Sequence, residues 1–153
     1  MKTVRLLLIL ALVIFALIQL IPKNLPQTSA DRQNDIISNG VVNAEIGGIL
    51  KSSCYDCHSM ETRYPWYSRI APASWLLKSD INEGRSHLNF SEWKTYSKME
   101  MIGKLGDIKE QVQSGDMPMP MYTLIHRKSK LNDAQKAALI QWTDQQSKSL
   151  LGQ

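Results

Sequence analysis

The sequence has only two cysteines among its 153 residues, and it is also poor in proline and glycine. Two cysteines are too few for a disulfide scaffold, so their placement must carry whatever they do. Six prolines and eight glycines beside 43% hydrophobic residues exclude collagen-like, low-complexity and disordered chains. A chain of this length fits one domain with a short appendage.

The chain also lacks a real excess of positive charge, although its formal net charge is +4. Three of its 18 basic residues, Lys2, Arg5 and Lys23, flank the first apolar run, which leaves 15 basic against 14 acidic residues elsewhere. A nearly neutral remainder gives no electrostatic footprint for a polyanion. We therefore expect no binding to nucleic acid.

The N-terminal segment is apolar from Val4 to Ile21, apart from two polar residues. A positive start followed by such a run engages a secretion machinery, and the nearest cleavage site, residues 28–30, is a weak match. Cleavage is left open, but as a helix the run would extend about 27 Å, close to the hydrocarbon thickness of a bilayer. The sequence therefore predicts a transmembrane signal-anchor over residues 1–22, single-pass in the inner (cytoplasmic) membrane, with the remainder in the periplasm.

The remainder of the chain is divided into a polar linker and a helical domain. Residues 23–40 are polar and are expected to be a linker with little structure of their own. Residues 41–153 show a helical apolar period, and nothing in them reads as a paired set of strands. The predicted fold class is all-α.

Helix-start and helix-stop signals divide this domain further. They predict a helix over residues 41–52, one over 72–84 that starts at Pro72 and ends at Gly84, and a short one capped by Ser91. A longer helix is predicted over 101–112, ended by Gly115. The last is predicted over 133–150, where Asn132 and Gln135 would form a capping box. Two prolines at alternate positions predict an extended loop over residues 116–124. The Gly47-Gly48 pair is either a weak point in the first helix or a flat spot where another helix approaches.

Cys54, Cys57 and His58 form the single place where both cysteines and a histidine converge, in the sequence Cys-Tyr-Asp-Cys-His. Two thiols separated by two residues at a helix end can both reach the vinyl groups of one haem and form thioether bonds. The next residue then presents its imidazole to the iron as the proximal ligand. The spacing predicts one covalently bound haem c.

Other uses of the same motif fit the sequence less well. A tetrahedral zinc site needs a second pair of ligands, and the sequence has no further cysteine. A thioredoxin-like redox pair would follow a strand within a βαβ frame, whereas the apolar period is helical. A structural disulfide across two residues would be strained and would leave His58 without a purpose. Haem attachment is therefore favoured.

The sixth ligand of the iron is expected to be a methionine. Met117, Met119 and Met121 lie on the proline-rich loop, where a soft thioether can reach the iron from a segment with little entropy to lose. Met117 comes first on the loop and is preferred, but the other two are left open. His87 and His126 are rivals, and both lie in polar stretches that favour a surface role.

The cysteine–histidine motif, the methionine loop and the final capped helix together are similar to small single-haem cytochromes c. In those proteins the first and last helices cross closely behind the haem, which favours Gly47-Gly48 as a flat spot meeting Trp142. More specifically, residues 41–143 resemble the bacterial haem-binding domain family (Haem_bd). The matching segments are LKSSCYDCHSMETRYPWYSRIAPASWLL, DINEGRSHLNFSEW, GDMPMPMY and LNDAQKAALIQW.

This resemblance implies a cytochrome c-like helical domain around one covalent haem over residues 41–153. It also implies haem c attached to Cys54 and Cys57, with His58 as the proximal ligand and Met117, followed by proline, as the distal one. The aromatic run over residues 64–67 is expected to form a wall of the haem site.

The function expected from these features is that of a membrane-tethered monohaem c-type cytochrome. It would transfer single electrons on the periplasmic side between membrane or periplasmic redox partners, with the membrane itself bound through the N-terminal helix, and it would not be an enzyme. The alternative is a haem-based sensor or gas-binding module with a displaceable distal ligand. A peroxidase would need an open distal pocket with an acid–base residue, for which His87 is the candidate, and is not expected.

Overall fold

The computed structural model describes residues 1–152, and within that range it contains helices and no strand. The expected all-α class is confirmed. In chain order the elements are α1 (Lys2–Ile18), α2 (Ala44–Ser53), α3 (Tyr55–His58), the 3₁₀ helix η1 (Trp66–Arg69), α4 (Ala73–His87), the 3₁₀ helix η2 (Phe90–Thr95), α5 (Lys98–Ser114), α6 (Pro120–Ile125), the 3₁₀ helix η3 (Arg127–Ser129) and α7 (Asp133–Leu151).

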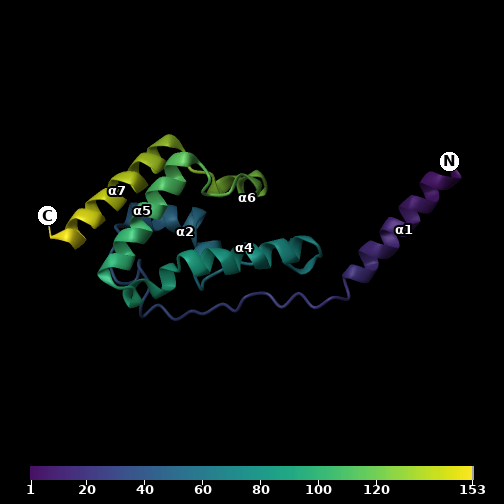
Figure 1. The fold of residues 1–153 in the computed structure, drawn as a ribbon, viewed down its shortest axis with the longest axis horizontal. Coiled ribbons are helices and arrows are strands. Elements are labelled where there is room, and N and C mark those ends of the chain that lie inside the picture. The colour runs from purple at the N-terminus through teal and green to yellow at the C-terminus, as the bar shows by residue number, and fades with distance from the viewer. Residues whose placement is uncertain (153) are drawn as a thin grey trace.

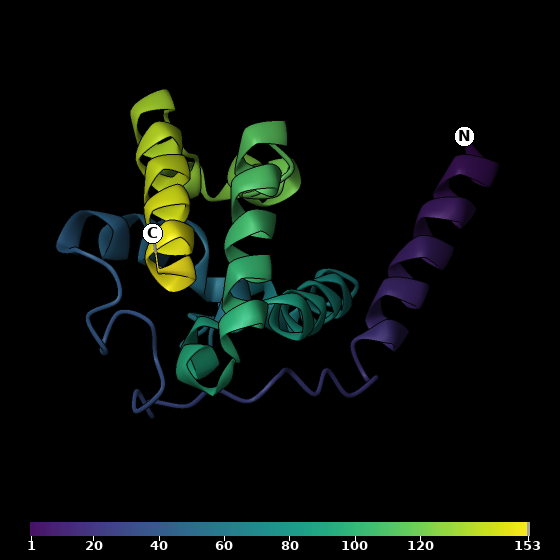
Figure 2. The ribbon, with the colours of Figure 1, turned by 60° about the vertical axis from the view of Figure 1, so that its left-hand side comes forward.

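The helices after α1 surround one core. α5 and α7 lie side by side as the most extensively packed pair, and α2 packs against α7 (Figures 1 and 2). α4 runs across the base of this group and packs against the short α3. An ion pair of 2.7 Å between the Lys109 amine and the Asp144 carboxylate also joins α5 to α7. The core is formed by apolar side chains of α2, η2, α5 and α7, among them Leu50, Trp93, Leu105, Leu139 and Trp142.

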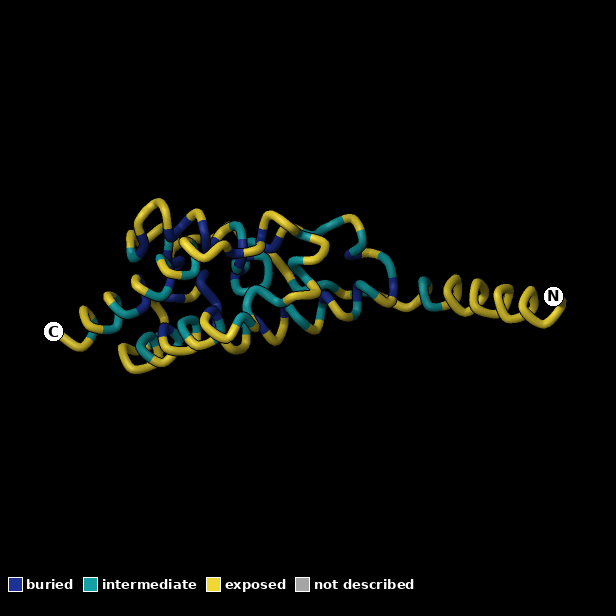
Figure 3. Tube along the Cα trace, turned by 90° about the horizontal axis from the view of Figure 1, so that it is seen from above, coloured by how far each residue is buried: buried dark blue, intermediate teal, exposed yellow. Residues whose placement is uncertain are grey.

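α1 is shorter than the sequence suggested. It ends at Ile18, none of its residues is buried, and Figure 3 shows it exposed along its length, projecting away from the other helices. Lys2 and Arg5 occupy its start, so its uninterrupted apolar part covers about 13 residues, or ~20 Å, against about 30 Å of bilayer hydrocarbon. No helix within residues 1–152 is long and apolar enough to cross a membrane. The predicted transmembrane anchor, and with it the single-pass inner-membrane location with a periplasmic domain, is therefore wrong.

The polar segment over residues 23–40 has little regular structure, as expected, but it is packed against the domain. Asp35 and Ile36 are fully buried. The Ile36 N–H donates to the Phe90 carbonyl at 3.0 Å, and the Asn34 carbonyl accepts from the Lys94 N–H at 3.1 Å. These residues close one side of the core, while the boundaries at residues 22 and 40 stay predictions.

Several helix ends follow local capping signals. Asn132 and Gln135 form the predicted capping box at the start of α7, and Gly115 ends α5 in the left-handed conformation with φ 82°. Other starts use caps that the sequence analysis did not identify. Asn43 caps α2 by accepting from the Ile46 N–H at 2.8 Å, so this helix begins at Ala44 and not at Val41. Asn89 rather than Ser91 caps η2.

Two glycine predictions need correction. α4 continues through Gly84 to His87 instead of ending there. The Gly47-Gly48 pair does not mark the crossing with Trp142, because a side chain at Gly47 would first meet Ile37 and Val42, and one at Gly48 would meet nothing within 4 Å. The close approach of two helices lies at Gly84 instead.

Candidate functional site

The cysteine–histidine motif lies at a break between two helices. α2 ends at Ser53, Cys54 adopts φ −125° and ψ −37°, and α3 then carries Cys57 and His58 on one turn. The Cys54 carbonyl accepts from the N–H groups of Cys57, at 3.2 Å, and His58, at 2.9 Å. This turn brings three side chains spread over five residues to one side of the chain.

Both cysteines are free thiols, and both have raised pKa values. Burial, with the neighbouring Cys57 as a smaller cause, raises the pKa of Cys54 to about 12. Burial, followed by the charges of Asp56 and Asp80, raises the pKa of Cys57 to about 11. Reactive redox cysteines instead have lowered pKa values beside cations or helix N-termini. The setting is therefore unlike that of a disulfide-exchange pair.

Gly84 allows α4 to pack directly on the motif. A Cβ atom added at Gly84 would lie 3.0 Å from the carbonyl oxygen of Cys57, which is closer than real Cβ contacts usually come. The sequence analysis took Gly84 for a helix end and missed this role. A signal was present, because a glycine inside an otherwise helical pattern often marks close packing.

The His58 imidazole is oriented by the chain that follows α4. Its Nδ1 lies 3.1 Å from the carbonyl oxygen of Leu88. Burial lowers the pKa of His58, which favours the neutral ring. A neutral imidazole that donates from Nδ1 keeps its lone pair on Nε2, which is the arrangement found in histidines that bind a metal.

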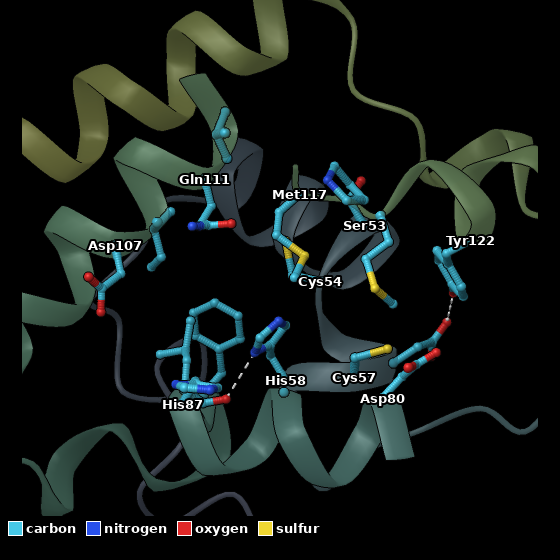
Figure 4. A pocket seen from close by; sticks show the side chains of 18 of the residues that line it. Ser53, Cys54, Cys57, His58, Asp80, His87, Asp107, Gln111, Met117 and Tyr122 are labelled. Atoms are coloured by element: carbon cyan, nitrogen blue, oxygen red, sulfur yellow. Dashed lines mark hydrogen bonds between the residues drawn. The ribbon is translucent and has the colours of Figure 1, made fainter. Parts of the chain in front are cut away.

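A cavity of about 490 Å³ lies beside the motif, and its volume is within the range of cofactor sites. Figure 4 shows His58, Cys57 and Met117 around this space, contributed by α3 and by the segment after α5. Apolar side chains form much of the wall: Leu88, Phe90, Ile108, Val112, Leu131 and Leu139. The cavity therefore combines two thiols, two imidazoles and two thioethers with a largely apolar lining.

The three candidate methionines are separated by the structure. Met117 and Met119 line the cavity, whereas Met121 does not and is 71% exposed. The Met117 N–H donates to the Gln111 carbonyl at 3.1 Å, which folds the segment back over α5. The predicted extended loop is wrong beyond Met119, because Pro120 begins α6, as its fixed φ allows at a helix start.

The two rival histidines lie in different places. His87 lines the cavity at the end of α4, beside His58 (Figure 4). His126 is not among the residues that line the cavity; its Nε2 lies 2.7 Å from the hydroxyl of Tyr67. The aromatic run over residues 64–67 does not line the cavity either, and Trp66 is 81% exposed.

Charged groups at the cavity are mainly acidic. Asp56, Asp80, Glu83 and Asp107 line it from α3, α4 and α5, and Lys104 is the lysine among the lining residues. The Lys104 amine donates to the His87 carbonyl at 2.8 Å, so it is already engaged. Within residues 1–152, no three His, Cys, Asp or Glu side chains converge as a ready metal-binding group.

Comparisons with known proteins identify the family of the chain. Residues 13–145 match the model of a family described as haem-binding domain. The chain is also 27% identical, over 120 residues, to a protein named cytochrome c peroxidase Ccp from Escherichia coli (strain K12). The match covers 76% of this chain but only 25% of that protein, so the chain spans about a quarter of the relative's length. No solved structure matches.

Proposed function

Because the chain belongs to the haem-binding domain family, we propose that it holds one haem c in the cavity beside α3 and serves as a single-electron carrier. The observation that carries this proposal is the convergence of Cys54, Cys57, His58 and Met117 on one cavity. Haem binding follows from the family, whereas the covalent attachment, the ligands and the electron transfer are the proposed parts.

The residues present fit a covalent haem. The two thiols are free and lie three positions apart, Cys54 at the N-cap of α3 and Cys57 on α3, the spacing that two vinyl groups require. The Leu88 carbonyl holds His58 with Nε2 available to iron. Met117 lies on a different segment of the same cavity, so an imidazole and a thioether would both be available to hold one metal.

A haem c held in this way supplies a reversible one-electron iron couple. The residues of this chain would influence which oxidation state of the iron is favoured. A thioether ligand and an apolar wall both favour the reduced, less charged form, while the Leu88 carbonyl makes His58 a better electron donor. With Met117 in place no coordination position is free for a substrate, so the proposed role is electron exchange with other redox proteins.

A haem sensor or a peroxidase would need an open or displaceable sixth position. The relative named as a cytochrome c peroxidase raises the second possibility. His87, the candidate acid–base group, lies beside His58 at the end of α4 and not beside Met117 (Figure 4). A distal acid–base group belongs across the haem from the proximal ligand, so this position favours the electron carrier.

The test is an optical spectrum of the full chain, co-produced with a cytochrome c maturation system. Sharp reduced bands that survive denaturation would establish thioether attachment, and changing Cys54 and Cys57 to alanine should abolish them. A weak far-red sulfur-to-iron band in the oxidised protein would support methionine ligation. High-spin bands, with rapid binding of carbon monoxide to the reduced protein, would instead support a sensor or an enzyme. A chain that retains no haem would refute the proposal.

A further inference from the structure

The helix that follows the methionine segment is poorly held by apolar packing. α6 has no buried residue, and three of its apolar side chains, Met121, Leu124 and Ile125, are each more than 60% exposed. Among the described elements, only η3, the next element in the chain, makes more than a weak contact with α6. Burial therefore does little to fix α6, and other contacts must hold it in place.

One such contact joins α6 to the cysteine–histidine motif itself. The Tyr122 hydroxyl donates to Oδ2 of Asp56 at 2.9 Å, and Asp56 is the residue immediately before Cys57. Oδ1 of Asp56 in turn accepts from the backbone N–H of Arg63, at 3.1 Å, and from its Nε, at 3.2 Å. The carboxylate is thus fixed on the motif side and offers Tyr122 a rigid acceptor.

A second contact holds the end of the same helix. Nε2 of His126, the C-cap residue of α6, lies 2.7 Å from the hydroxyl of Tyr67 on η1. The His126 ring stacks on Tyr122 with centroids 4.4 Å apart and planes 20° apart. The stacking couples the two hydrogen bonds, so that α6 is tied to α3 and η1 through one continuous group of side chains.

These contacts lie at the far end of the segment that carries Met117. At its near end, the Met117 N–H is bound to the Gln111 carbonyl of α5. We infer that Tyr122, through its bond to Asp56, is a positioning residue that keeps the Met117 thioether over the cavity. The inference rests on the proposed function, because it gives Asp56, which lies between the two cysteines, a part in positioning Met117 as an iron ligand.

The test measures how readily added imidazole replaces the Met117 sulfur on the iron of the oxidised, haem-loaded full chain. Tyr122→Phe keeps the stacked ring and removes the hydroxyl alone. Since a hydrogen bond to a charged group stabilises the closed segment substantially, imidazole should bind about tenfold more tightly to this variant. Its far-red band should also fade at a lower temperature than its helical circular dichroism signal, which a general loss of stability would not produce.

The matched control is Tyr64→Phe. Tyr64 also donates its hydroxyl to an oxygen, the Pro26 carbonyl, but it lies outside the methionine segment. This control should leave imidazole affinity within twofold of the parent. Combining Tyr122→Phe with Asp56→Ala should change the affinity by less than the sum of the two single effects, because both variants lose the bond between Tyr122 and Asp56.

The outcomes separate this inference from the proposed function. If Met117→Ala abolishes the far-red band but Tyr122→Phe leaves imidazole affinity and the band unchanged, methionine ligation stands and the positioning role of Tyr122 is overturned. If Met117→Ala itself leaves the band unchanged, the proposed distal ligand is overturned and the inference falls with it.

Discussion

The carbonyl oxygen of Cys57 occupies the space that a side chain at Gly84 would need, at 3.0 Å from the position of its Cβ. Backbone thus meets backbone where α4 crosses the cysteine–histidine motif. The contact sets the depth of one wall of the cavity, because α4 also carries Asp80, Glu83 and His87 along its edge.

Gly84→Ala should therefore destabilise the protein despite the better helix propensity of alanine. The methyl group forces α4 away from Cys57, and we expect a loss of about 1–2 kcal/mol in the free energy of unfolding, as for other overpacked sites. Gly103→Ala on α5 is the control, since a Cβ atom at Gly103 would meet nothing within 4 Å. This variant should gain up to ~1 kcal/mol in the free energy of unfolding. Denaturant unfolding measures both. Equal effects at the two glycines would contradict the close-packing role.

The methionines of the segment should differ in their effect on the haem spectrum. Met117→Ala should remove the far-red band of the oxidised protein and open the iron to carbon monoxide, because its thioether is the proposed ligand. Met121→Ala is the matched control, since Met121 is 71% exposed and does not line the cavity. Loss of the band in Met119→Ala alone would move the assignment to Met119, the other methionine that lines the cavity.

Asp35 should be essential for stability although it lies in the polar segment. Its carboxylate is 1% exposed and accepts from the Tyr55 hydroxyl at 2.9 Å and from the N–H groups of Ile37 and Ser38. Asp35→Ala leaves the buried Tyr55 hydroxyl without an acceptor, which should cost about 3 kcal/mol of unfolding free energy. Asp31→Ala, whose contact with the Gln33 N–H is exposed, should cost less than ~1 kcal/mol. Similar values for the two would refute a structural role for Asp35.

Asp80 should make the stability of the protein depend on pH in the opposite direction to a salt-bridged carboxylate. Burial, and then the charge of Glu83, raise the pKa of Asp80 above its usual value. The folded protein therefore holds this proton more tightly than the unfolded chain, so stability falls as pH rises from the unfolded pKa, near 4, through the folded one. Asp80→Asn should raise stability slightly at pH 7, and the gain should vanish below about pH 4. Urea midpoints across this range provide the measurement, and a gain that persists at pH 3 would contradict the assignment.

The features that sequence analysis predicted correctly depend on residues close together in the chain. Asn132 and Gln135, which form the capping box of α7, are three positions apart in the sequence, and the apolar period of α5 and α7 is likewise local. The Cys54–Cys57–His58 spacing carries the family resemblance in the same way. Hydropathy alone could not reveal that α1 ends at Ile18, because the apolar run continues past the last helical residue.

The features that were missed join residues far apart. Tyr122 meets Asp56 across 66 positions, Tyr55 meets Asp35 across 20, and no pattern within one helix indicates either pair. The role of Gly84 likewise depends on where α4 packs and not on its own sequence. Polar residues of the segment over 23–40 suggested a free linker, since burial of Asp35 becomes favourable only when distant hydrogen-bond partners are present.

Cys54 and Cys57 line the cavity beside α4, a helix that Gly84 allows to dock in direct contact with the backbone of Cys57. If haem is attached to Cys54 and Cys57 as proposed, it would have to enter the cavity before α4 and the other helices that form its walls are fully packed. Attachment is therefore expected to come before folding is complete. A chain that folded first would not be able to take up haem. The prosthetic group would then act as the nucleus around which the last helices assemble.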